Sequence, residues 1–292
     1  MINPAKPMIG KICLITGATS GIGLKTAEAL AKMGATTIIV GRNKDKCLKI
    51  VNKIKDISNN PDVNYFTADL SSLEKIQHLA QAVKKHYYHL DILINNVGAK
   101  FVKRQESVDG YEMTFALNHL GPFLLTHLLL EVLKKSTGGR IINVSSGAHT
   151  GCPQIDFNDL QSRHGYVGKK AYALSKLANI SFTYELARRL KVTSITANSL
   201  HPGGVATNFC KNNGLFSWGK HLLAHLLARN LVCPVEGART SIYLASSPEV
   251  NGANGKYFIN LKPASSSSIS YDPQTAQHLW QVSLKLTGLA SS

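Results

Sequence analysis

The sequence predicts an α/β fold in which helices cover both faces of a doubly wound parallel sheet. Short apolar runs alternate with longer amphipathic stretches along most of the 292 residues, as in repeated strand–helix–strand units. The intervening segments are long enough for the right-handed crossovers that join parallel strands. The chain shows no repeat, linker or break in composition. We therefore expect residues 1–292 to form a single domain.

The strands are predicted from short runs rich in β-branched and aliphatic residues. The first, Lys11–Thr16, has the almost wholly apolar sequence KICLIT, which is typical of a strand buried on both faces. Similar runs recur after each amphipathic stretch. In chain order, the expected strands are Lys11–Thr16, Thr36–Val40, Val63–Thr67, Leu90–Asn95, Arg140–Ser145, Thr193–Leu200 and Lys256–Ile259.

The helices are predicted from the stretches between these runs, where apolar residues recur at helical spacing. Lysines dominate the polar side of the second helix, which we interpret as a solvated face. The expected helices are Ile22–Met33, Lys44–Ile57, Leu73–His86, Tyr111–Lys135, Lys169–Leu190 and Val235–Ser246. The serine run Ser265–Ser268 is expected to be a flexible loop tip.

The chain is strongly basic, with 33 Lys and Arg against 17 Asp and Glu, a net charge of +16. This balance favours an anionic partner, which leaves nucleic acid, a membrane surface and a phosphorylated ligand open. No basic groove interleaved with aromatic residues is evident, so nucleic-acid binding is not expected. The hydrophobic fraction of 44% excludes a disordered chain.

Cysteine and histidine spacing favours neither a disulfide framework nor a metal site. The five cysteines are an odd, widely spread set without a CxxC pair, and the histidines show no convergent ligand set. Only ten residues precede the first apolar run, and nowhere do 18 apolar residues follow one another. We therefore expect neither a signal peptide nor a transmembrane helix, and we expect a cytoplasmic location.

A glycine-rich loop follows the first strand directly and opens the first helix. Its sequence is TGATSGIG, from Thr16 to Gly23. Gly17 permits a tight turn, Gly21 lets the backbone approach a pyrophosphate, and Gly23 lets helix and strand pack closely. The helix N-terminus then offers unpaired amides to the anion. Strand, glycines and helix in this order predict a dinucleotide-binding site.

The end of the second strand indicates which dinucleotide binds. An acidic residue there would bind the adenosine 2′-hydroxyl of NAD, but the segment reads VGRNK. The guanidinium of Arg42 is suited to a 2′-phosphate, and Lys44 would add charge. Arg42 as a solvated residue at the sheet edge is the alternative. We expect the cofactor to be NADP(H).

Tyr172 and Lys176 stand four residues apart within one predicted helix, so they share one face. A phenol ordinarily ionises near pH ~10, and a nearby ammonium together with a positively charged nicotinamide would stabilise the tyrosinate. The pair is therefore suited to exchange a proton with an alcohol or carbonyl oxygen. Ser146 ends the fifth strand, where its hydroxyl would reach the same oxygen. Taken singly, each residue also fits a surface pair or a turn.

Together these motifs resemble those of the short-chain dehydrogenase/reductase family, over residues of about 9 to 288. The matching segments are Thr16–Gly23, Asp69-Leu70, Asn95–Gly98, Asn118, Ile141–Ser146, Tyr172 with Lys176, and His201–Thr207. The family's NNAG motif has Val97 in place of alanine, which narrows the expected ribose region. The resemblance implies a Rossmann-like fold and a catalytic set of Asn118, Ser146, Tyr172 and Lys176.

The resemblance also implies a role for each residue. Tyr172 exchanges the proton, Ser146 orients the carbonyl oxygen, Lys176 binds the nicotinamide ribose, and Asn118 holds a water that links Lys176 to solvent. The cofactor-binding residues implied by the motifs are Gly17, Thr19, Ser20, Gly21, Ile22, Gly23, Arg42, Asp69, Leu70, Asn95, Tyr172, Lys176, Pro202, Gly203, Val205 and Thr207. The expected reaction is hydride transfer that interconverts an alcohol and a carbonyl.

The retinol dehydrogenase-like branch of the family is the most similar. It is indicated by Asn118–Thr126, by the long loop between Ser146 and Tyr172, and by the tail Leu279–Gly288. The N-terminal anchor of many vertebrate relatives is not evident. A retinol-like substrate, or another apolar aldehyde or ketone, is the substrate class this branch implies.

Residues 208–233 resemble a substrate lid, and within them 215–229 form a basic amphipathic segment. A lid, a dimer surface and a peripheral membrane contact remain open for that segment. The resemblance implies a homodimer or homotetramer formed through the helices of residues about 111–135 and 169–190. The alternative function is a non-catalytic NADP(H)-binding redox sensor or interaction protein, which the presence of all four catalytic residues disfavours.

Overall fold

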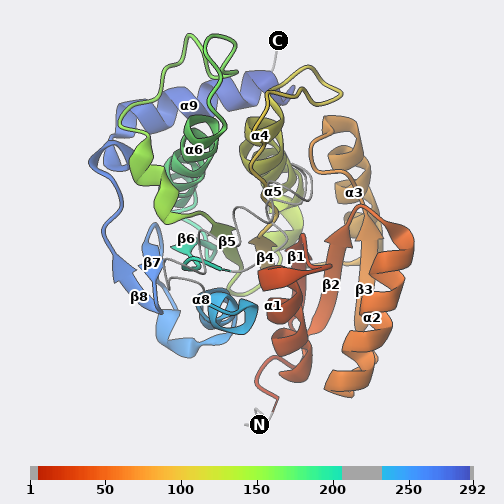
Figure 1. Ribbon diagram of the computed structural model, residues 1–292. Coiled ribbons are helices and arrows are strands. Elements are labelled where there is room, and N and C mark those ends of the chain that lie inside the picture. Colours follow the sequence, from red (N-terminus) through yellow and green to blue (C-terminus); the bar gives the residue numbers. More distant parts are fainter. Residues whose placement is uncertain (1–5, 206–231, 290–292) are drawn as a thin grey trace.

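An eight-stranded sheet runs through the centre of the structure, a computed structural model that describes residues 6–205 and 232–289 (Figure 1). Its strands are β1 (Ile12–Thr16), β2 (Thr36–Gly41), β3 (Val63–Thr67), β4 (Ile92–Asn95), β5 (Arg140–Val144), β6 (Thr196–His201), β7 (Tyr257–Ile259) and β8 (Lys262–Ala264). Their order across the sheet is β3-β2-β1-β4-β5-β6-β7-β8. All neighbouring pairs are parallel except β7 with β8. The strand order reverses between β1 and β4, where a doubly wound sheet opens a crevice.

Helices cover both faces of the sheet, so the predicted doubly wound fold is confirmed (Figure 1). One face carries α1 (Gly21–Lys32), α2 (Lys44–Ser58) and α8 (Pro234–Ser246). The other carries α3 (Leu73–His86), α5 (Gly121–Leu133), α6 (Gly168–Arg189) and α9 (Pro273–Leu286). Short helical turns complete the described chain: α4 (Met113–Phe115), η1 (Ala116–Leu120), η2 (Gly147–Gly151), η4 (Pro248–Val250) and η5 (Ser268–Tyr271).

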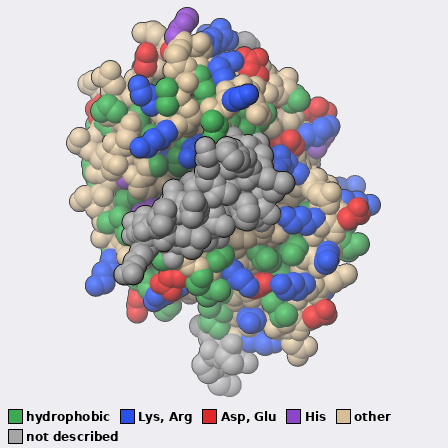
Figure 2. All heavy atoms as spheres, viewed as in Figure 1, with side chains coloured by type: hydrophobic (Ala, Val, Ile, Leu, Met, Phe, Trp, Pro, Cys, Tyr) green, Lys and Arg blue, Asp and Glu red, His purple; other side chains and the backbone are tan. Residues whose placement is uncertain are grey.

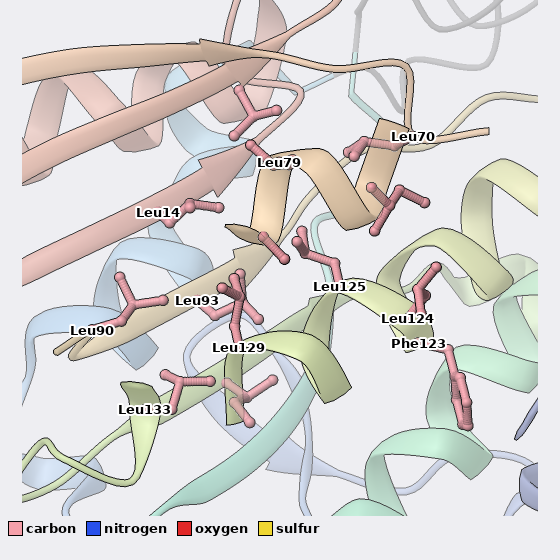
Figure 3. Packing of buried hydrophobic residues seen from close by; sticks show 14 of the residues in the cluster. Leu14, Leu70, Leu79, Leu90, Leu93, Phe123, Leu124, Leu125, Leu129 and Leu133 are labelled. Carbon is pink, nitrogen blue, oxygen red and sulfur yellow. The ribbon is translucent and has the colours of Figure 1, made fainter. Parts of the chain in front are cut away.

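Two hydrophobic cores lie on opposite faces of the sheet because successive strand residues point to opposite sides. Leu14 of β1 and Leu93 of β4 pack against α3 and α5, where Leu79 and Leu129 meet them (Figure 3). The next residue along β1, Ile15, packs into the second core beneath α1 and α2. Strands buried on both faces hold the carboxyl edge of the sheet rigid, and that edge positions the site.

The predicted helix Tyr111–Lys135 is interrupted in the structure. It begins at Met113 as α4, widens into the single π-turn η1, and continues as α5 to Leu133. A Cβ on Gly121 would lie 2.3 Å from the Leu70 carbonyl oxygen, so the chain approaches this helix too closely for any side chain. A π-turn changes the facing of the residues that follow it, and such turns are frequent at functional sites.

The C-terminal region holds one strand, β8, and one α-helix, α9, that were not expected from the sequence. Trp280 of α9 lies 5.3 Å from Phe123 of α5 and 5.9 Å from Phe182 of α6 between ring centroids, and Arg189 stacks on it at 4.3 Å. Helix α9 therefore covers part of the outer face of α5 and α6. These are the helices through which the expected oligomer would form, and the oligomer stays a prediction.

The predicted flexible tip at Ser265–Ser268 is tied to its surroundings. The Ser266 hydroxyl lies 2.7 Å from the Tyr184 hydroxyl of α6, and the Ser266 amide donates to the Tyr271 hydroxyl at 3.0 Å. Composition shows neither partner, and Tyr184 is 82 residues away in the sequence. Residues 265–267 form a loop, and its flexibility stays a prediction.

One described helix, Met113–Leu133, is long and apolar enough to cross a membrane, but 78% of its most apolar window is buried within the protein. That burial is typical of a core helix. On the face shown in Figure 2, Lys and Arg side chains are scattered among acidic and hydrophobic ones. They do not gather there into one continuous basic stripe.

Candidate active site

A cavity of about 440 Å³ lies at the carboxyl edge of the sheet, between β1 and β4, where the direction of the strand order reverses. It extends from the glycine loop before α1 to Tyr172 and Lys176 on α6. The segment after β4, from Asn96 to Ala99, lines the space between them. The cavity therefore joins the two groups of residues that the sequence marks for cofactor binding and for proton transfer.

The glycine loop has the backbone geometry that its sequence predicts. Gly17 has φ +66° and Gly21 has φ +58°, a conformation that favours glycine. A Cβ on Gly23 would lie 2.5 Å from Nδ2 of Asn96 and 2.7 Å from the Gly17 carbonyl oxygen. No side chain fits there, so Gly23 allows helix, loop and β4 to pack together.

The N-terminus of α1 is left open towards the cavity. Its N-cap residue, Ser20, makes no side-chain hydrogen bond to the first helical amides. By contrast, Asn43 caps α2 by accepting from the Lys46 amide, and Ser72 caps α3 by accepting from the Lys75 amide. An uncapped helix start beside a glycine loop is a site for an anion. These features fit the pyrophosphate of a dinucleotide.

Asn96 holds the glycine loop in place, a role that the sequence analysis had not assigned. Its side-chain amide donates to the Thr16 carbonyl at 2.8 Å, and its backbone amide donates to Oγ1 of Thr16 at 3.0 Å. Asn95, the residue expected to bind cofactor, does not line the cavity. Its side chain is buried and donates to Thr126 and Asn143 beneath α5. The two adjacent asparagines were the available signal in the sequence. The sequence does not show which of the two side chains faces the site.

Arg42 and Lys46 supply positive charge where the cavity passes the end of β2. Lys44, the second cation expected there, does not line the cavity. No Asp or Glu belongs to the described residues that do, so nothing there would bind a 2′-hydroxyl through a carboxylate. This end of the cavity fits a phosphorylated ribose.

Tyr172 and Lys176 lie on one face of α6 and both line the cavity. Nζ of Lys176 lies 5.7 Å from the centroid of the Tyr172 ring and donates to the Val144 carbonyl at 2.9 Å. Lys176 is 3% exposed, and burial lowers the pKa of its ammonium to about 8. One of its three hydrogens is committed to Val144, which leaves two to bind a ligand.

Asn118 lies in the π-turn η1 and is fully buried behind Lys176. Its oxygen accepts from the Ala99 amide, and its nitrogen donates to the Ala99 carbonyl, both at 2.9 Å. The second hydrogen goes to Oγ of Ser175 at 3.0 Å. Both amide hydrogens are therefore used by the protein, and a water at Asn118 would have to donate to an oxygen. A Cβ on Gly98 would lie 3.2 Å from Nζ of Lys176 and 3.5 Å from Oδ1 of Asn118.

Ser145 and Ser146 follow β5 with different surroundings. Ser145 lines the cavity, and its hydroxyl donates to the Lys176 carbonyl at 2.8 Å. Ser146, the predicted catalytic serine, is half-buried and begins the turn η2, where its Oγ accepts from the Ala148 amide at 3.1 Å. It is not among the residues that line the cavity, although η2 packs directly against α6.

The remaining predicted cofactor residues are divided by the structure. Leu70 and Pro202 line the cavity, whereas the Asp69 carboxylate accepts from the amide and the hydroxyl of Ser71. Gly203, with φ +85°, borders a neighbouring cavity that shares Pro202. Val205 pairs with Val232 as an isolated bridge. Thr207, and all of the expected lid except its last two residues, lie outside the described residues.

No group of three or more His, Cys, Asp or Glu side chains gathers for a metal ion within residues 6–205 and 232–289.

Comparisons with known proteins agree with this geometry. Residues 11–216 match the short chain dehydrogenase family model. The chain is 39% identical to human polyprenol dehydrogenase over 99% of its own length and 88% of that protein. It is 40% identical to human retinol dehydrogenase 14 over 97% of its length and 88% of that protein.

Solved structures show the same family likeness. A putative uncharacterized protein from Mycobacterium paratuberculosis superposes with a TM-score of 0.75 at 31% identity, covering 96% of this chain and 94% of that one. The Pseudomonas aeruginosa RhlG/NADP active-site complex gives 0.70 at 28% identity over 88% and 96%. The chain belongs to the short-chain dehydrogenase family, in its retinol dehydrogenase-like branch, and is an oxidoreductase that acts on CH–OH groups with a nicotinamide cofactor.

Proposed function

We propose that the protein interconverts a lipophilic alcohol and the corresponding carbonyl compound with NADP(H), and that Tyr172 exchanges the proton. The observation that carries this proposal is one cavity that joins the glycine loop to the Tyr172–Lys176 pair. The only charged side chains among its described lining residues are three cations, Arg42, Lys46 and Lys176.

NADP(H) is supported by the distribution of these groups. The open N-terminus of α1 and the glycine loop would hold the pyrophosphate. Arg42 would bind the 2′-phosphate bidentately, and Lys46 would add a second positive charge. The two uncommitted hydrogens of Lys176 would bind the nicotinamide ribose. NADP is also the ligand named for RhlG, whose fold this chain shares.

In the carbonyl-reducing direction, bound NADPH supplies a hydride to the carbonyl carbon. The Tyr172 hydroxyl donates its proton to the carbonyl oxygen, which completes the alcohol. The Lys176 ammonium, 5.7 Å from the ring, stabilises the tyrosinate that remains. The Ser146 hydroxyl donates a hydrogen bond to the same oxygen as negative charge develops there. In the opposite direction Tyr172 accepts the alcohol proton.

Lys176 is suited to pass the proton on. Its pKa of about 8, lowered by burial, lets it lose and regain a proton near neutral pH. Asn118 holds the segment 98–99 against Lys176 through its bonds to Ala99. A water that donates to an oxygen of Asn118 would complete the path to solvent.

A lipophilic substrate is supported by the relatives, whose names specify polyprenol and retinol. Residues 208–233, which contain the segment LFSW and the run HLLAHLLAR, would supply an apolar lid. We therefore expect long-chain or cyclic apolar aldehydes to react and charged sugars not to react.

Two measurements on the purified protein test the proposal. The first is titration with NADPH and NADH, and the second is turnover with retinal, a polyprenal and glucose 6-phosphate. We expect NADPH to bind at least about tenfold more tightly than NADH, because a bidentate charge-assisted contact contributes about 1.5–3 kcal/mol. Arg42→Asp is expected to remove that preference and to spare NADH. Tight NADPH binding without turnover of any carbonyl or alcohol would contradict the proposal and favour the redox sensor.

A further inference from the structure

We propose that His149 is a positioning residue, which holds Ser146 in its working orientation by joining the turn after β5 to the C-terminal segment 265–271. This inference rests on the proposed function, because it concerns the serine that would bind the substrate oxygen.

His149 lies in the turn η2, whose N-cap residue is Ser146. The side chain of His149 is buried, with His149 2% exposed. Its Nδ1 lies 2.8 Å from the Ser146 carbonyl oxygen, and its backbone amide donates to the same oxygen at 3.2 Å. Two contacts from one residue thus hold the Ser146 carbonyl. The Cα and the hydroxyl of Ser146 are only a few bonds from this carbonyl, so a shift of His149 would move them.

The other ring nitrogen of His149 fixes its protonation state. Nε2 lies 3.0 Å from the backbone nitrogen of Ser267. Because an amide can only donate, Nε2 is the acceptor, and Nδ1 carries the hydrogen that it donates to Ser146. The neutral ring therefore makes both bonds, and burial lowers its pKa, which favours this neutral form.

The segment that receives His149 is itself fixed to the catalytic helix. Ser266, next to Ser267, bonds through its hydroxyl to Tyr184 of α6 at 2.7 Å, and the Ser270 amide donates to the Ser267 carbonyl at 3.0 Å. Since α6 also carries Tyr172, His149 connects the serine turn to the element that holds the proton donor. The Ser146 and Tyr172 hydroxyls, which would contact the substrate oxygen, are thus connected through one set of hydrogen bonds.

Two further side chains, those of Tyr257 and His201, lie near the His149 ring. The ring of Tyr257 on β7 lies 5.2 Å from that of His149, centroid to centroid. His201 on β6 approaches the same turn, with its Nε2 3.2 Å from where a Cβ on Gly147 would sit. A phenylalanine at position 149 would keep the packing against Tyr257 and remove both ring hydrogen bonds.

A double-mutant cycle tests the inference with His149→Phe, Ser146→Ala and the combined variant. His149→Phe is expected to lower kcat for retinal reduction by about 10- to 100-fold, since a misplacement near 1 Å has effects of this size. KM and the NADPH dissociation constant should change less than about threefold. In the Ser146→Ala background the same substitution should lower kcat less than about threefold, because no serine hydroxyl remains to be misplaced.

His149→Asn and His127→Phe serve as controls. The asparagine nitrogen takes the place of Nδ1 and is expected to restore most of kcat. His127 is a half-buried histidine of α5 bonded to the Phe123 carbonyl, and its replacement should lower Tm with an unchanged kcat.

Three results would overturn the inference. Equal losses from His149→Phe with and without Ser146, or a lower Tm with an unchanged kcat, would make His149 structural only. An unchanged kcat in Ser146→Ala would remove the serine from the reaction and the inference with it, although the tyrosine mechanism would stand. A wild-type protein that binds NADPH but turns over no substrate would overturn the proposed function itself.

Discussion

The two ends of the cavity are built in different ways. The phosphate end is centred on one short segment, from Thr16 to Gly23, whose shape depends on backbone conformation and on the absence of side chains. Asn96 holds this segment in place, and Arg42 and Lys46 add charge beside it. The catalytic end is assembled from β5, η1 and α6, where side chains bond to the backbone of distant elements. Lys176 bonds to Val144 and Asn118 bonds to Ala99 in this way. The comparison indicates that the glycine loop depends mainly on local geometry, whereas the proposed proton-transfer site depends on tertiary packing.

The largest effect is expected at Tyr172, where a substitution should change turnover without changing cofactor affinity. Tyr172→Phe is expected to lower kcat by about 10²- to 10⁴-fold, because general acid–base groups contribute that much. NADPH affinity should change less than about threefold, because the phosphate end is unaltered. Steady-state turnover and fluorescence titration of the same preparation measure both. Near wild-type turnover would show that Tyr172 does not transfer the proton.

The second prediction concerns the packing of Gly23 at the phosphate end. Gly23→Ala places a Cβ 2.5 Å from Nδ2 of Asn96, so the Asn96 bond to Thr16 must give way. Overpacking of this kind costs about 1–3 kcal/mol. The free protein can relieve the clash by shifting the loop, whereas pyrophosphate binding requires the loop in its packed geometry. A cost of this size in the bound state weakens NADPH binding by about 5- to 150-fold. Gly138→Ala is the matched control, because its Cβ would meet nothing within 4 Å. Equal NADPH affinities of the two variants would contradict the close packing at Gly23.

The third prediction concerns buried charge at the catalytic end. The folded-state pKa of Lys176 is about 8 against an ordinary value of 10.5. Between these two pH values the unfolded chain binds a proton that the folded chain lacks, so this residue's contribution to the free energy of unfolding rises with pH. Below pH 8 both states are protonated, and the cost of burying the ammonium is constant.

Urea denaturation of the cofactor-free protein measures this effect against Lys176→Met. The difference in free energy of unfolding between wild type and variant should rise with pH across the window, with a slope approaching about 1.4 kcal/mol per pH unit. Using the difference removes the opposite contribution of the buried thiols Cys13, Cys47 and Cys152, whose pKa values burial raises. Parallel curves would show that Lys176 is not desolvated.

The smallest expected effect distinguishes two neighbouring lysines at the phosphate end. Lys46→Ala is expected to weaken NADPH about two- to fivefold and to leave NADH unchanged, because an exposed ion pair contributes up to about 1 kcal/mol. Lys44→Ala should change neither affinity by as much as twofold, since Lys44 does not line the cavity. Titrations at low and high salt measure both, and the Lys46 effect should shrink at high salt. The reverse ranking would place Lys44 at the phosphate.

Lys44 and Asn95, expected at the site but absent from the cavity lining, differ from the neighbours that do line it by a rotation about an element axis. Lys44 and Lys46 are two residues apart on α2, so they point to different sides of the helix. Which side meets the cavity depends on how Cys47, Val51 and Ile54 are buried against the sheet. Asn95 and Asn96 differ in the same way. Asn95 is the last residue of β4 and points beneath α5, whereas Asn96 turns back to Thr16.

The sequence by itself determined the order of strands β1 to β7 and of the main described helices between them, the glycine loop, and the shared face of Tyr172 and Lys176. All of these follow from periodicity and from backbone preferences within a few residues. Only the tertiary structure decided the π-turn at Asn118, the burial of Lys176 and the bond from Ser267 to His149. Each of these depends on groups far apart in the chain, whose meeting is set by packing across the sheet and leaves no periodic signal in the sequence.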